Sequence, residues 1–404
     1  MNKIIIVNNG DLPLPAVKGG AVETLIDLLV NENEKYGDFQ FEIYSNYDEK
    51  AIKESQKFKN SKFIYVKQNG IVAKIKRFLI RIVNFIALRT GGYFHSFLVS
   101  KAIVRNVYRS PEQYSAILLE GTSLDAYYLS KKTHLPIFQR VHNIPGRGLK
   151  QFDTDSAKAT CAYLGISKFI CNNVVEHEGK YCKNIELLYN SVDFELFRKE
   201  FNKNDKKDLR SKLGFDNDDF IVMFSGRLRE FKGIGKLLEA FIELREQKSI
   251  KLMMVGSAYF SSNERTDFEK SLDPLIKALG PQVKFTGYVP YKEMYKYYML
   301  ADLCVFPSIW QEPFALTCLE ALVCGRAVIV TQSGGLVEVV NEKCAITVPI
   351  NDDLSNNLAK QILFLYNNPW KIREMESEAI KRADFFSPDK QYRDFSRIIH
   401  KYCD

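Results

Sequence analysis

The chain has 404 residues, a length that suits two domains, each with a core of its own. Its composition, 46% hydrophobic and 26% charged, is ordinary for a soluble globular protein, and no segment reaches the roughly 18 uninterrupted apolar residues of a membrane-spanning helix. The net charge of +8 is modest and no nucleic-acid-binding module is recognisable, so nucleic acid is not an expected partner.

The N-terminus and the cysteines indicate a cytoplasmic protein. The first apolar run, Ile4 to Val7, is too short for a signal peptide and suits a first strand. The eight cysteines form no C-x-x-C pair and have no histidine partners at zinc spacing, which favours reduced cysteines in a cytosolic protein. The acidic clusters at residues 153–155 and 216–219 are interpreted as solvated loops. No metal site and no cofactor are expected.

Along the chain, strand-like apolar runs alternate with helical patterns, which predicts parallel sheets. A helix is expected at residues 21–33, and the strands expected in the first half are residues 4–7, 41–44, 63–66, 116–119 and 137–140. The charged stretch at residues 199–219 is the most plausible domain boundary. A second β/α half then runs from a strand at residues 220–224 to about residue 380, and a last helix is expected near residues 388–404.

The basic residues are unevenly distributed. Residues 51–150 hold 18 Lys and Arg against four acidic residues, so the rest of the chain is net acidic. Within this block, residues 70–89 form an apolar helical pattern with its basic side chains toward one side: Lys74, Lys76, Arg77 and Arg81. Two interpretations stay open, an interfacial helix on anionic lipid and a core helix with a solvated basic face.

Adjacent glycines, Gly19 and Gly20, lie between the first strand and the first helix. Two glycines let the backbone approach a ligand closely, and a helix N-terminus favours an anion. The spacing is not that of a G-x-G-x-x-G dinucleotide turn. A purely structural turn is the alternative.

His142 follows the strand expected at residues 137–140, at the strand end where α/β sheets place ligands. The other four histidines have no comparable setting. A histidine with a purely structural role is the alternative.

The segment from Ser225 to Gly233, S-G-R-L-R-E-F-K-G, follows the strand at residues 220–224. Gly226 permits a tight turn, and Arg227 with Lys232 offers forked donors and a point charge that together can neutralise a diphosphate. Arg229 is expected to face solvent. A chance basic pair beside a turn is the alternative.

Two carboxylates, Glu312 and Glu320, flank an expected strand-to-helix junction in which Pro313 occupies the first helical turn. Glu320 would then lie about two turns in, and both carboxylates could grip one hydroxylated ligand. The backbone N–H groups at the helix start would favour an anion, namely those of Phe314, Ala315 and Leu316. The alternative is two glutamates without a shared role.

The segment from Glu312 to Glu320, E-P-F-A-L-T-C-L-E, the following A-L-V-C-G-R-A-V-I-V-T and the turn at residues 333–335 resemble the signature of retaining family 4 glycosyltransferases. The segment S-G-R-L-x-x-x-K-G resembles the diphosphate clamp of that family. The resemblance covers nearly the whole chain, is strongest at residues 220–340, and is weakest at residues 40–130. Ala315 stands where the family usually has Gly.

The resemblance implies an α/β chain with the GT-B fold, in which two Rossmann-like domains with parallel sheets face each other across a cleft. The predicted N-terminal, acceptor-binding domain is residues 1–198 together with a C-terminal helix, residues 385–404, that crosses back to it. The predicted donor-binding domain is residues 199–384. The activity implied is a retaining, metal-independent transfer of a sugar from a nucleotide-diphosphate sugar.

The family also implies roles for individual residues. Arg227 and Lys232 would stabilise the leaving diphosphate, Glu320 would bind ribose hydroxyls, and Glu312 and His142 would bind the donor sugar. Gly19 and Gly20 match the family's N-terminal G-G-x-E-type loop, with one extra residue before Glu23. Main-chain groups near Val289 would meet the nucleobase. Ser191 replaces the usual Gly of an N-G-V-D segment, which is interpreted as structural.

A uridine diphosphate sugar is the expected donor, on family frequency. The basic helix suggests a saccharide or lipid-linked acceptor in cell-surface polysaccharide biosynthesis, and a protein peripheral to the inner face of the plasma membrane. Two alternatives stay open: a non-catalytic nucleotide-sugar-binding partner subunit, and a nucleotide-sugar epimerase or hydrolase. A nicotinamide-dependent dehydrogenase would need a glycine fingerprint that the sequence lacks.

Overall fold

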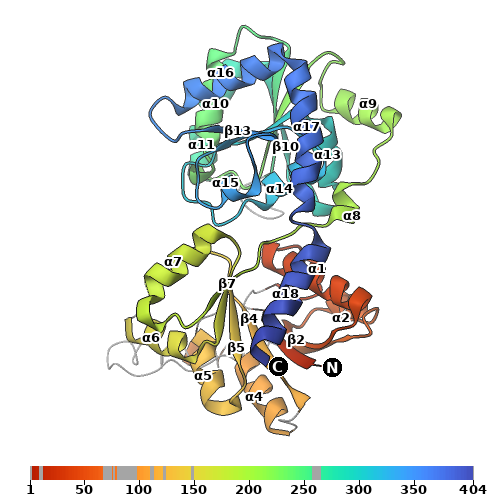
Figure 1. The fold of residues 1–404 in the computed structure, drawn as a ribbon. Coiled ribbons are helices and arrows are strands. Elements are labelled where there is room, and N and C mark those ends of the chain that lie inside the picture. The colour runs from red at the N-terminus through yellow and green to blue at the C-terminus, as the bar shows by residue number, and fades with distance from the viewer. Residues whose placement is uncertain are drawn as a thin grey trace. The chain divides into compact units, whose positions relative to one another are not determined.

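The structure is a computed structural model that describes residues 2–8, 12–66, 75, 78–79, 98–109, 113–121, 124–146, 150–256 and 265–403. The chain forms two compact units, Met1–Asn190 with Pro388–Asp404, and Ser191–Ser387. Each unit is a parallel β-sheet with helices on its faces (Figure 1). The two Rossmann-like α/β units expected from the alternation of strands and helices are confirmed.

The N-terminal unit has a seven-stranded parallel sheet in the order β3-β2-β1-β4-β5-β6-β7. Its strands are β1 (Asn2–Asn8), β2 (Phe39–Asn46), β3 (Ser61–Val66), β4 (Ala116–Glu120), β5 (Ile137–Val141), β6 (Ala162–Gly165) and β7 (Ile185–Leu187). All five strands expected from the sequence lie within β1–β5. The central strands are continuous apolar runs because a parallel sheet is covered on both faces.

Helices cover both faces of this sheet. They are α1 (Ala21–Tyr36), α2 (Glu49–Ser55), α4 (Leu98–Arg109), α5 (Leu124–Thr133), α6 (Lys150–Ala159), α7 (Lys168–Glu178) and α18 (Pro388–Cys403). Ile4 and Ile6 pack in the core that includes α1 and α18, whereas Ile5 and Val7 pack in the core that includes α4 and α5. This division follows from the alternation of side chains along a strand.

The last helix, α18, packs beside α1 on the N-terminal unit, as the resemblance implied (Figure 1). Tyr392 and Phe395 are buried against Phe39, with ring centroids 6.4 Å and 5.8 Å apart. The Tyr392 hydroxyl donates a 2.8 Å hydrogen bond to Asn33 Oδ1. These buried contacts attach the C-terminus of the chain to its first helix.

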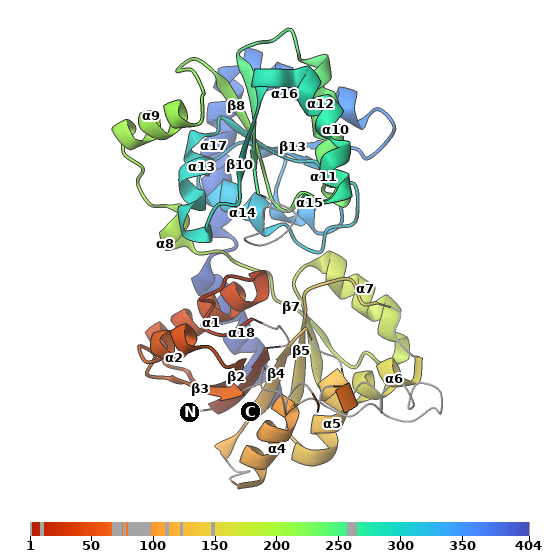
Figure 2. The same cartoon turned by 180° about the vertical axis from the view of Figure 1, so that it is seen from behind.

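The C-terminal unit has a six-stranded parallel sheet in the order β10-β9-β8-β11-β12-β13. Its strands are β8 (Phe220–Ser225), β9 (Ile250–Val255), β10 (Val283–Gly287), β11 (Leu303–Phe306), β12 (Val328–Thr331) and β13 (Ala345–Val348). Its helices are α8 (Phe194–Phe197), α9 (Lys203–Lys212), α10 (Ile234–Glu243), α11 (Asp267–Ser271), α12 (Asp273–Leu279), α13 (Met294–Leu300), α14 (Leu316–Val323), α15 (Leu336–Val339), α16 (Leu354–Asn367) and α17 (Pro369–Asp384). Figure 2 shows α10, α12 and α16 together on one side of this sheet.

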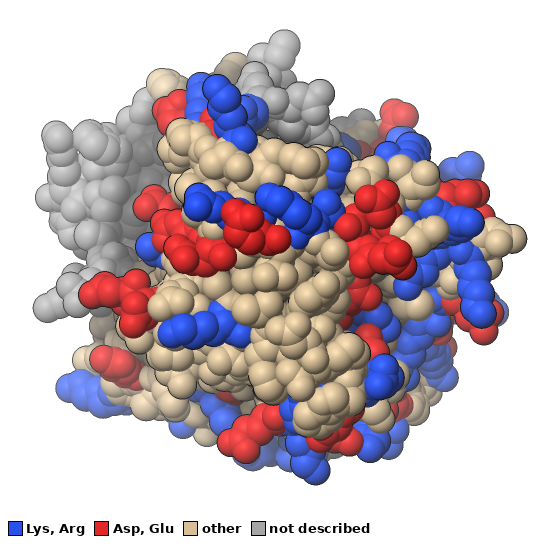
Figure 3. Space-filling model, turned by 90° about the horizontal axis from the view of Figure 1, so that it is seen from above, with Lys and Arg blue, Asp and Glu red and all other residues tan. Residues whose placement is uncertain are grey.

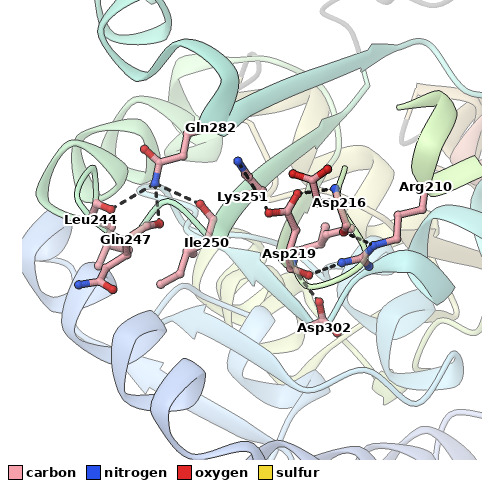
Figure 4. Close-up of polar contacts among 10 residues, drawn as sticks. Arg210, Asp216, Asp219, Leu244, Gln247, Ile250, Lys251, Gln282 and Asp302 are labelled. Atoms are coloured by element: carbon pink, nitrogen blue, oxygen red, sulfur yellow. Dashed lines mark hydrogen bonds and ion pairs between the residues drawn. The ribbon is translucent and has the colours of Figure 1, made fainter. Parts of the chain in front are cut away.

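Polar side chains tie the loops at the amino ends of these strands, as Figure 4 shows. The Gln282 amide donates to the carbonyl oxygens of three residues before and at the start of β9, at 3.2, 3.0 and 3.1 Å: Leu244, Gln247 and Ile250. Asp219 is buried, lies 3.7 Å from Lys251 Nζ, and accepts a hydrogen bond from the backbone N–H of Asp216. The interpretation of residues 216–219 as a fully solvated loop was therefore wrong for Asp219.

The two units meet in sequence at residues 190 and 191, whereas the predicted boundary followed residue 198. The intervening residues pack with the C-terminal unit. Asp193 caps the short helix α8 by accepting from the Leu196 N–H at 2.8 Å, and Phe197 packs edge-on against Tyr298. The chain returns to the N-terminal unit at Pro388, whereas the return was predicted at residue 385. The difference arises because Phe386 packs against Phe314 of the C-terminal unit, with ring centroids 5.8 Å apart.

On the face of the molecule seen in Figure 3, basic and acidic side chains are interspersed. Within the described part of the chain, no helix has the length and apolarity needed to cross a membrane. The predicted basic helix at residues 70–89 lies almost entirely outside the described residues, and this includes all four of its singled-out cations: Lys74, Lys76, Arg77 and Arg81.

Candidate active site

Lys232 and Glu312 form an ion pair beyond the C-terminal ends of β8 and β11. Lys232 Nζ lies 2.6 Å from Glu312 Oε1, and Ser308 Oγ donates to the same oxygen. Glu312 is only 3% exposed, whereas the Lys232 side chain keeps 22% of its surface accessible. The carboxylate of the pair is therefore buried, and the lysine is its partly accessible member.

Gly233 allows these two loops to meet. Its φ is 71°, and an added Cβ would lie 1.8 Å from the carbonyl oxygen of Pro307. The Ile309 N–H also donates to the Phe231 carbonyl at 3.0 Å. Only glycine combines this left-handed conformation with so close a backbone approach. Gly233 is thus the reason that Lys232 can reach Glu312.

A third loop, after β12, holds the backbone of Glu312. The Glu312 N–H donates to Ser333 Oγ at 3.1 Å, and the Gly335 N–H donates to the Glu312 carbonyl at 2.6 Å. The glycine-containing turn at residues 333–335 is therefore a support for Glu312. Three successive loops at the carboxyl edge of the sheet fix one carboxylate, and this is the edge at which open α/β sheets bind ligands.

Glu320 is buried on α14 and does not contact Glu312. Tyr298 donates a 2.8 Å hydrogen bond to Glu320 Oε2, and Ser225 Oγ lies 2.7 Å from the Tyr298 hydroxyl. Burial raises the pKa of the Glu320 carboxyl to about 8, even though the hydrogen bond from Tyr298 acts to lower it. A carboxyl with this pKa holds a proton at neutral pH and can release it when a better set of donors arrives.

The helix after Glu312 begins later than predicted. Helix α14 starts at Leu316, so Pro313 precedes it and Glu320 lies about one turn in, where two were expected. Of the three expected helix-start amides, only that of Leu316 belongs to the first turn. Ala315 is the N-cap residue, with φ −97° and no side-chain cap, a conformation that does not require glycine.

The expectation that Arg229 faces solvent is only partly met. Arg227 is exposed and Arg229 is half-buried. Gly226 has φ 144°, and an added Cβ on the neighbouring Gly256 would lie 2.1 Å from the Gly226 carbonyl oxygen. Val289 is buried in the loop after β10. These loops all lie at the same carboxyl edge as Lys232.

In the N-terminal unit, Gly19 and Gly20 have positive φ values of 75° and 106°, and Gly20 is the N-cap of α1. Glu23 lies directly under this turn, because a Cβ on Gly20 would come within 2.2 Å of Glu23 Oε2. The buried Glu23 carboxylate also accepts a 3.2 Å hydrogen bond from Asn8 Nδ2. The extra residue before Glu23 therefore does not remove it from the turn.

His142 lies at the carboxyl edge of the same sheet, against a carboxylate that the sequence interpretation missed. His142 Nε2 is 2.6 Å from Glu120 Oε2, and Arg140 Nη1 is 3.6 Å from Glu120 Oε1. Burial raises the pKa of Glu120, but the charge of Arg140 and the hydrogen bond from His142 bring that pKa below its usual value. The available signal was Glu120 itself, an acidic residue at the end of an apolar strand.

The site candidates therefore fall into two groups. Lys232, Glu312 and Glu320 belong to the C-terminal unit with Gly226, Arg227 and Val289, and His142 belongs to the N-terminal unit with Gly19 and Gly20. Tyr298 and Ser308, which contact the two glutamates, were not predicted as site residues. In the described ranges, no group of three or more His, Cys, Asp or Glu side chains could hold a metal ion.

Comparisons with known proteins find similarity to glycosyltransferases. Residues 205–383 match the family described as Glycosyl transferases group 1. The chain is 33% identical to the lipopolysaccharide 1,2-N-acetylglucosaminetransferase of Salmonella typhimurium over 142 residues, which is 35% of this chain and 37% of that protein. It is 22% identical to the putative glycosyltransferase YtcC of Bacillus subtilis over 95% of this chain and 88% of that protein.

The chain thus spans little more than a third of the Salmonella protein in that match. Among solved structures, HepE (Alr3699) of Anabaena in complex with UDP has a TM-score of 0.74 and 18% identity, covering 99% of this chain and 100% of that one. The chain therefore has the GT-B fold, and its residues 205–383 are similar to the group 1 glycosyl transferases.

Proposed function

We propose that this chain is a glycosyltransferase that moves a sugar from a nucleotide-diphosphate sugar, with UDP as the nucleotide, to a saccharide or lipid-linked acceptor. The observation that carries the proposal is the Lys232–Glu312 pair at the carboxyl edge of the sheet, within the segment that matches the group 1 glycosyl transferases. The solved complexes of HepE with UDP and with UDP-glucose support the choice of nucleotide.

The chemistry requires a stabilised leaving group. When the sugar–phosphate bond breaks, negative charge develops on the departing diphosphate, and preorganised cations lower the barrier most. The Lys232 ammonium has three N–H donors, of which one contacts Glu312, so the others can serve a phosphate. The exposed Arg227 can add a forked contact to the same diphosphate.

The two glutamates would hold the two ends of the donor. Glu312 would accept hydrogen bonds from the hydroxyls of the donor sugar, and Glu320 from those of the ribose. His142, with the Gly19–Gly20 turn, would contact the sugar and the phosphate. The expected reaction is retaining and needs no metal, with the leaving phosphate helping to deprotonate the acceptor.

A donor screen followed by a transfer assay tests this proposal. The purified protein would be incubated with a panel of UDP-sugars and a saccharide acceptor, and both UDP release and the anomeric configuration of the product would be measured. Release that needs the acceptor, survives EDTA and retains configuration is expected. Release without acceptor would indicate a hydrolase, and the absence of release would indicate a binding subunit.

Two matched variants make the assay specific. Lys232→Ala should abolish UDP release, because the leaving diphosphate loses its main cation. Lys236→Ala removes a lysine of α10 that also pairs with a glutamate, Glu239, at 2.8 Å, but at the surface. Equal loss in both variants would contradict the role of Lys232.

Peripheral contact with an anionic membrane is proposed from the sequence of residues 70–89. Binding to liposomes containing phosphatidylserine would be compared between the wild-type protein and the quadruple Lys74, Lys76, Arg77 and Arg81→Glu variant. Loss of binding in the variant is expected because juxtamembrane cations contribute attraction to anionic lipid. Unchanged binding would contradict the proposal.

A further inference from the structure

Glu120, Arg140 and His142 form a buried cluster of ionisable side chains at the carboxyl edge of the N-terminal sheet. Glu120 ends β4 and Arg140 lies opposite it on β5, so the two adjacent strands deliver both residues to the same place. Both side chains are fully buried, and His142 follows two residues after Arg140 with only 7% of its side chain exposed. Charges this deep are costly unless each has a partner.

The geometry shows which partner Glu120 serves. Its Oε2 lies 2.6 Å from His142 Nε2, whereas Arg140 Nη1 is 3.6 Å from Oε1, beyond hydrogen-bond distance. Among the described residues, Glu120 Oε1 and Arg140 Nη1 are buried and have no hydrogen-bond partner, while Arg140 Nη2 donates to Asn190 Oδ1 at 3.0 Å. The carboxylate is thus held closer to the imidazole than to its counterion.

The backbone after Glu120 permits this contact. Gly121 has φ 81°, and an added Cβ would lie 3.7 Å from His142 Cδ2. The left-handed backbone, which favours glycine, lets the chain turn away directly after the carboxylate, and the 3.7 Å spacing is an ordinary van der Waals contact. A carboxylate accepts hydrogen bonds, so in this contact the proton is on Nε2 of the imidazole. In the neutral ring the other nitrogen, Nδ1, is then a hydrogen-bond acceptor.

We propose that Glu120 is a positioning residue that fixes a proton on Nε2 of His142, so that Nδ1 faces a hydroxyl of the donor sugar. Arg140 keeps Glu120 ionised and in place, and is itself too buried to touch a ligand. This inference rests on the proposed function, because it assigns the partner of a histidine expected to contact the sugar. It predicts that loss of Glu120 changes recognition of the sugar and leaves recognition of the nucleotide unchanged.

The first test examines the wild-type protein and needs no donor. Nitrogen-15 NMR of protein labelled at histidine would report the protonation of each ring nitrogen, and His142→Gln would assign the signal among the five histidines. A protonated Nε2 at His142 is expected. An unprotonated Nε2 would overturn the proposal.

The second test is a double-mutant cycle on binding. Affinities for UDP and for the UDP-sugar selected by the donor screen would be measured for Glu120→Gln, His142→Ala and the double variant. In each single variant, the ratio of the affinity for the UDP-sugar to the affinity for UDP should fall about tenfold, which is the contribution of about one hydrogen bond. In the double variant this ratio should fall no further than in either single variant. Additive losses would overturn the proposal, since a merely structural Glu120 would act independently of His142.

Two further variants separate positioning from folding. Glu120→Asp keeps the charge beside Arg140 but withdraws the carboxylate from His142, so it should fold and still lose the sugar preference. Gln139→Met removes a buried polar side chain of the same strand that contacts Thr160, on the other face of the sheet. It should leave the preference unchanged. If the wild-type protein binds no UDP-sugar, the proposed function fails, and the NMR measurement alone decides the Glu120–His142 contact.

Discussion

Lys232 and Glu312 form an ion pair across two loops, with Nζ 2.6 Å from Oε1. The glutamate is held at three points: by Ser308 at its carboxylate, and by Ser333 and Gly335 at its backbone. The lysine has fewer constraints and more exposure. A diphosphate can therefore approach the cation from solvent without displacing the carboxylate from its supports.

Removing the lysine should destabilise the fold. Lys232→Met leaves the buried Glu312 carboxylate without its cation, and we expect the free energy of unfolding to fall by about 1–3 kcal/mol, reduced by the partial exposure of the lysine. Lys236→Met, at a surface pair, should cost less than about 0.5 kcal/mol. Urea denaturation of both variants measures the difference, and equal losses would show that Glu312 does not depend on Lys232.

Substitution of Glu312 should mainly lower turnover, whereas substitution of Glu320 should mainly lower the affinity for UDP. Glu312→Gln removes a contact to the reacting sugar, so turnover should fall on the order of 100-fold while UDP affinity stays within about threefold. Glu320→Gln should weaken UDP affinity about tenfold, the loss of one charge-assisted hydrogen bond. Steady-state kinetics and UDP titration distinguish them. A Glu312 variant that mainly lost UDP affinity would reverse the assignment.

UDP binding should release a proton through Glu320. In the free protein this carboxyl has a pKa raised to about 8, so it is protonated at pH 7. Ribose hydroxyls would favour the ionised form, so affinity should rise as pH increases through the pKa of about 8 and level off above it. Calorimetric titration in buffers of different ionisation enthalpy counts the protons. Glu320→Gln should bind without this release, and identical proton release in both proteins would exclude Glu320 as its source.

Gly233 should tolerate alanine far less than Gly287. Their φ values, 71° and 70°, are nearly equal, but a Cβ at Gly233 would meet the Pro307 carbonyl at 1.8 Å, and one at Gly287 would meet nothing within 4 Å. We expect about 1 kcal/mol of destabilisation for Gly287→Ala from backbone strain, and at least about 3 kcal/mol for Gly233→Ala. Thermal melts of the two variants decide this, and similar melting temperatures would mean that the loop moves aside.

Ser191 should contribute through its hydroxyl. Ser191 Oγ is buried and donates a 2.6 Å hydrogen bond to the Phe386 carbonyl, beside the crossing into α18. Ser191→Ala removes this buried hydrogen bond, which should cost about 1 kcal/mol. Ser271→Ala removes a comparable 2.7 Å bond to the Phe268 carbonyl at an exposed position and should be nearly neutral. Chemical denaturation would contradict this account if both variants matched the wild-type protein.

The sequence by itself determined the two α/β units and the strands that carry the candidate residues. Strands such as β4 and β8 are continuous apolar runs because both faces of a parallel sheet are buried, and this pattern is local in sequence. Lys232, Glu312 and His142 could be singled out for the same reason, since each follows the end of such a strand. Their place at a carboxyl edge then follows from parallel topology.

Only the tertiary structure decided which side chains meet. Tyr298 and Glu320 are 22 residues apart, as are Glu120 and His142, and in each case the partners come from different elements. The start of α14 at Leu316 was equally hidden, because contacts from Ser333 and Gly335 hold Glu312 outside the helix that Pro313 seemed to open. Hydrogen bonds between separate loops leave no periodic trace in a sequence, whereas burial on a strand does.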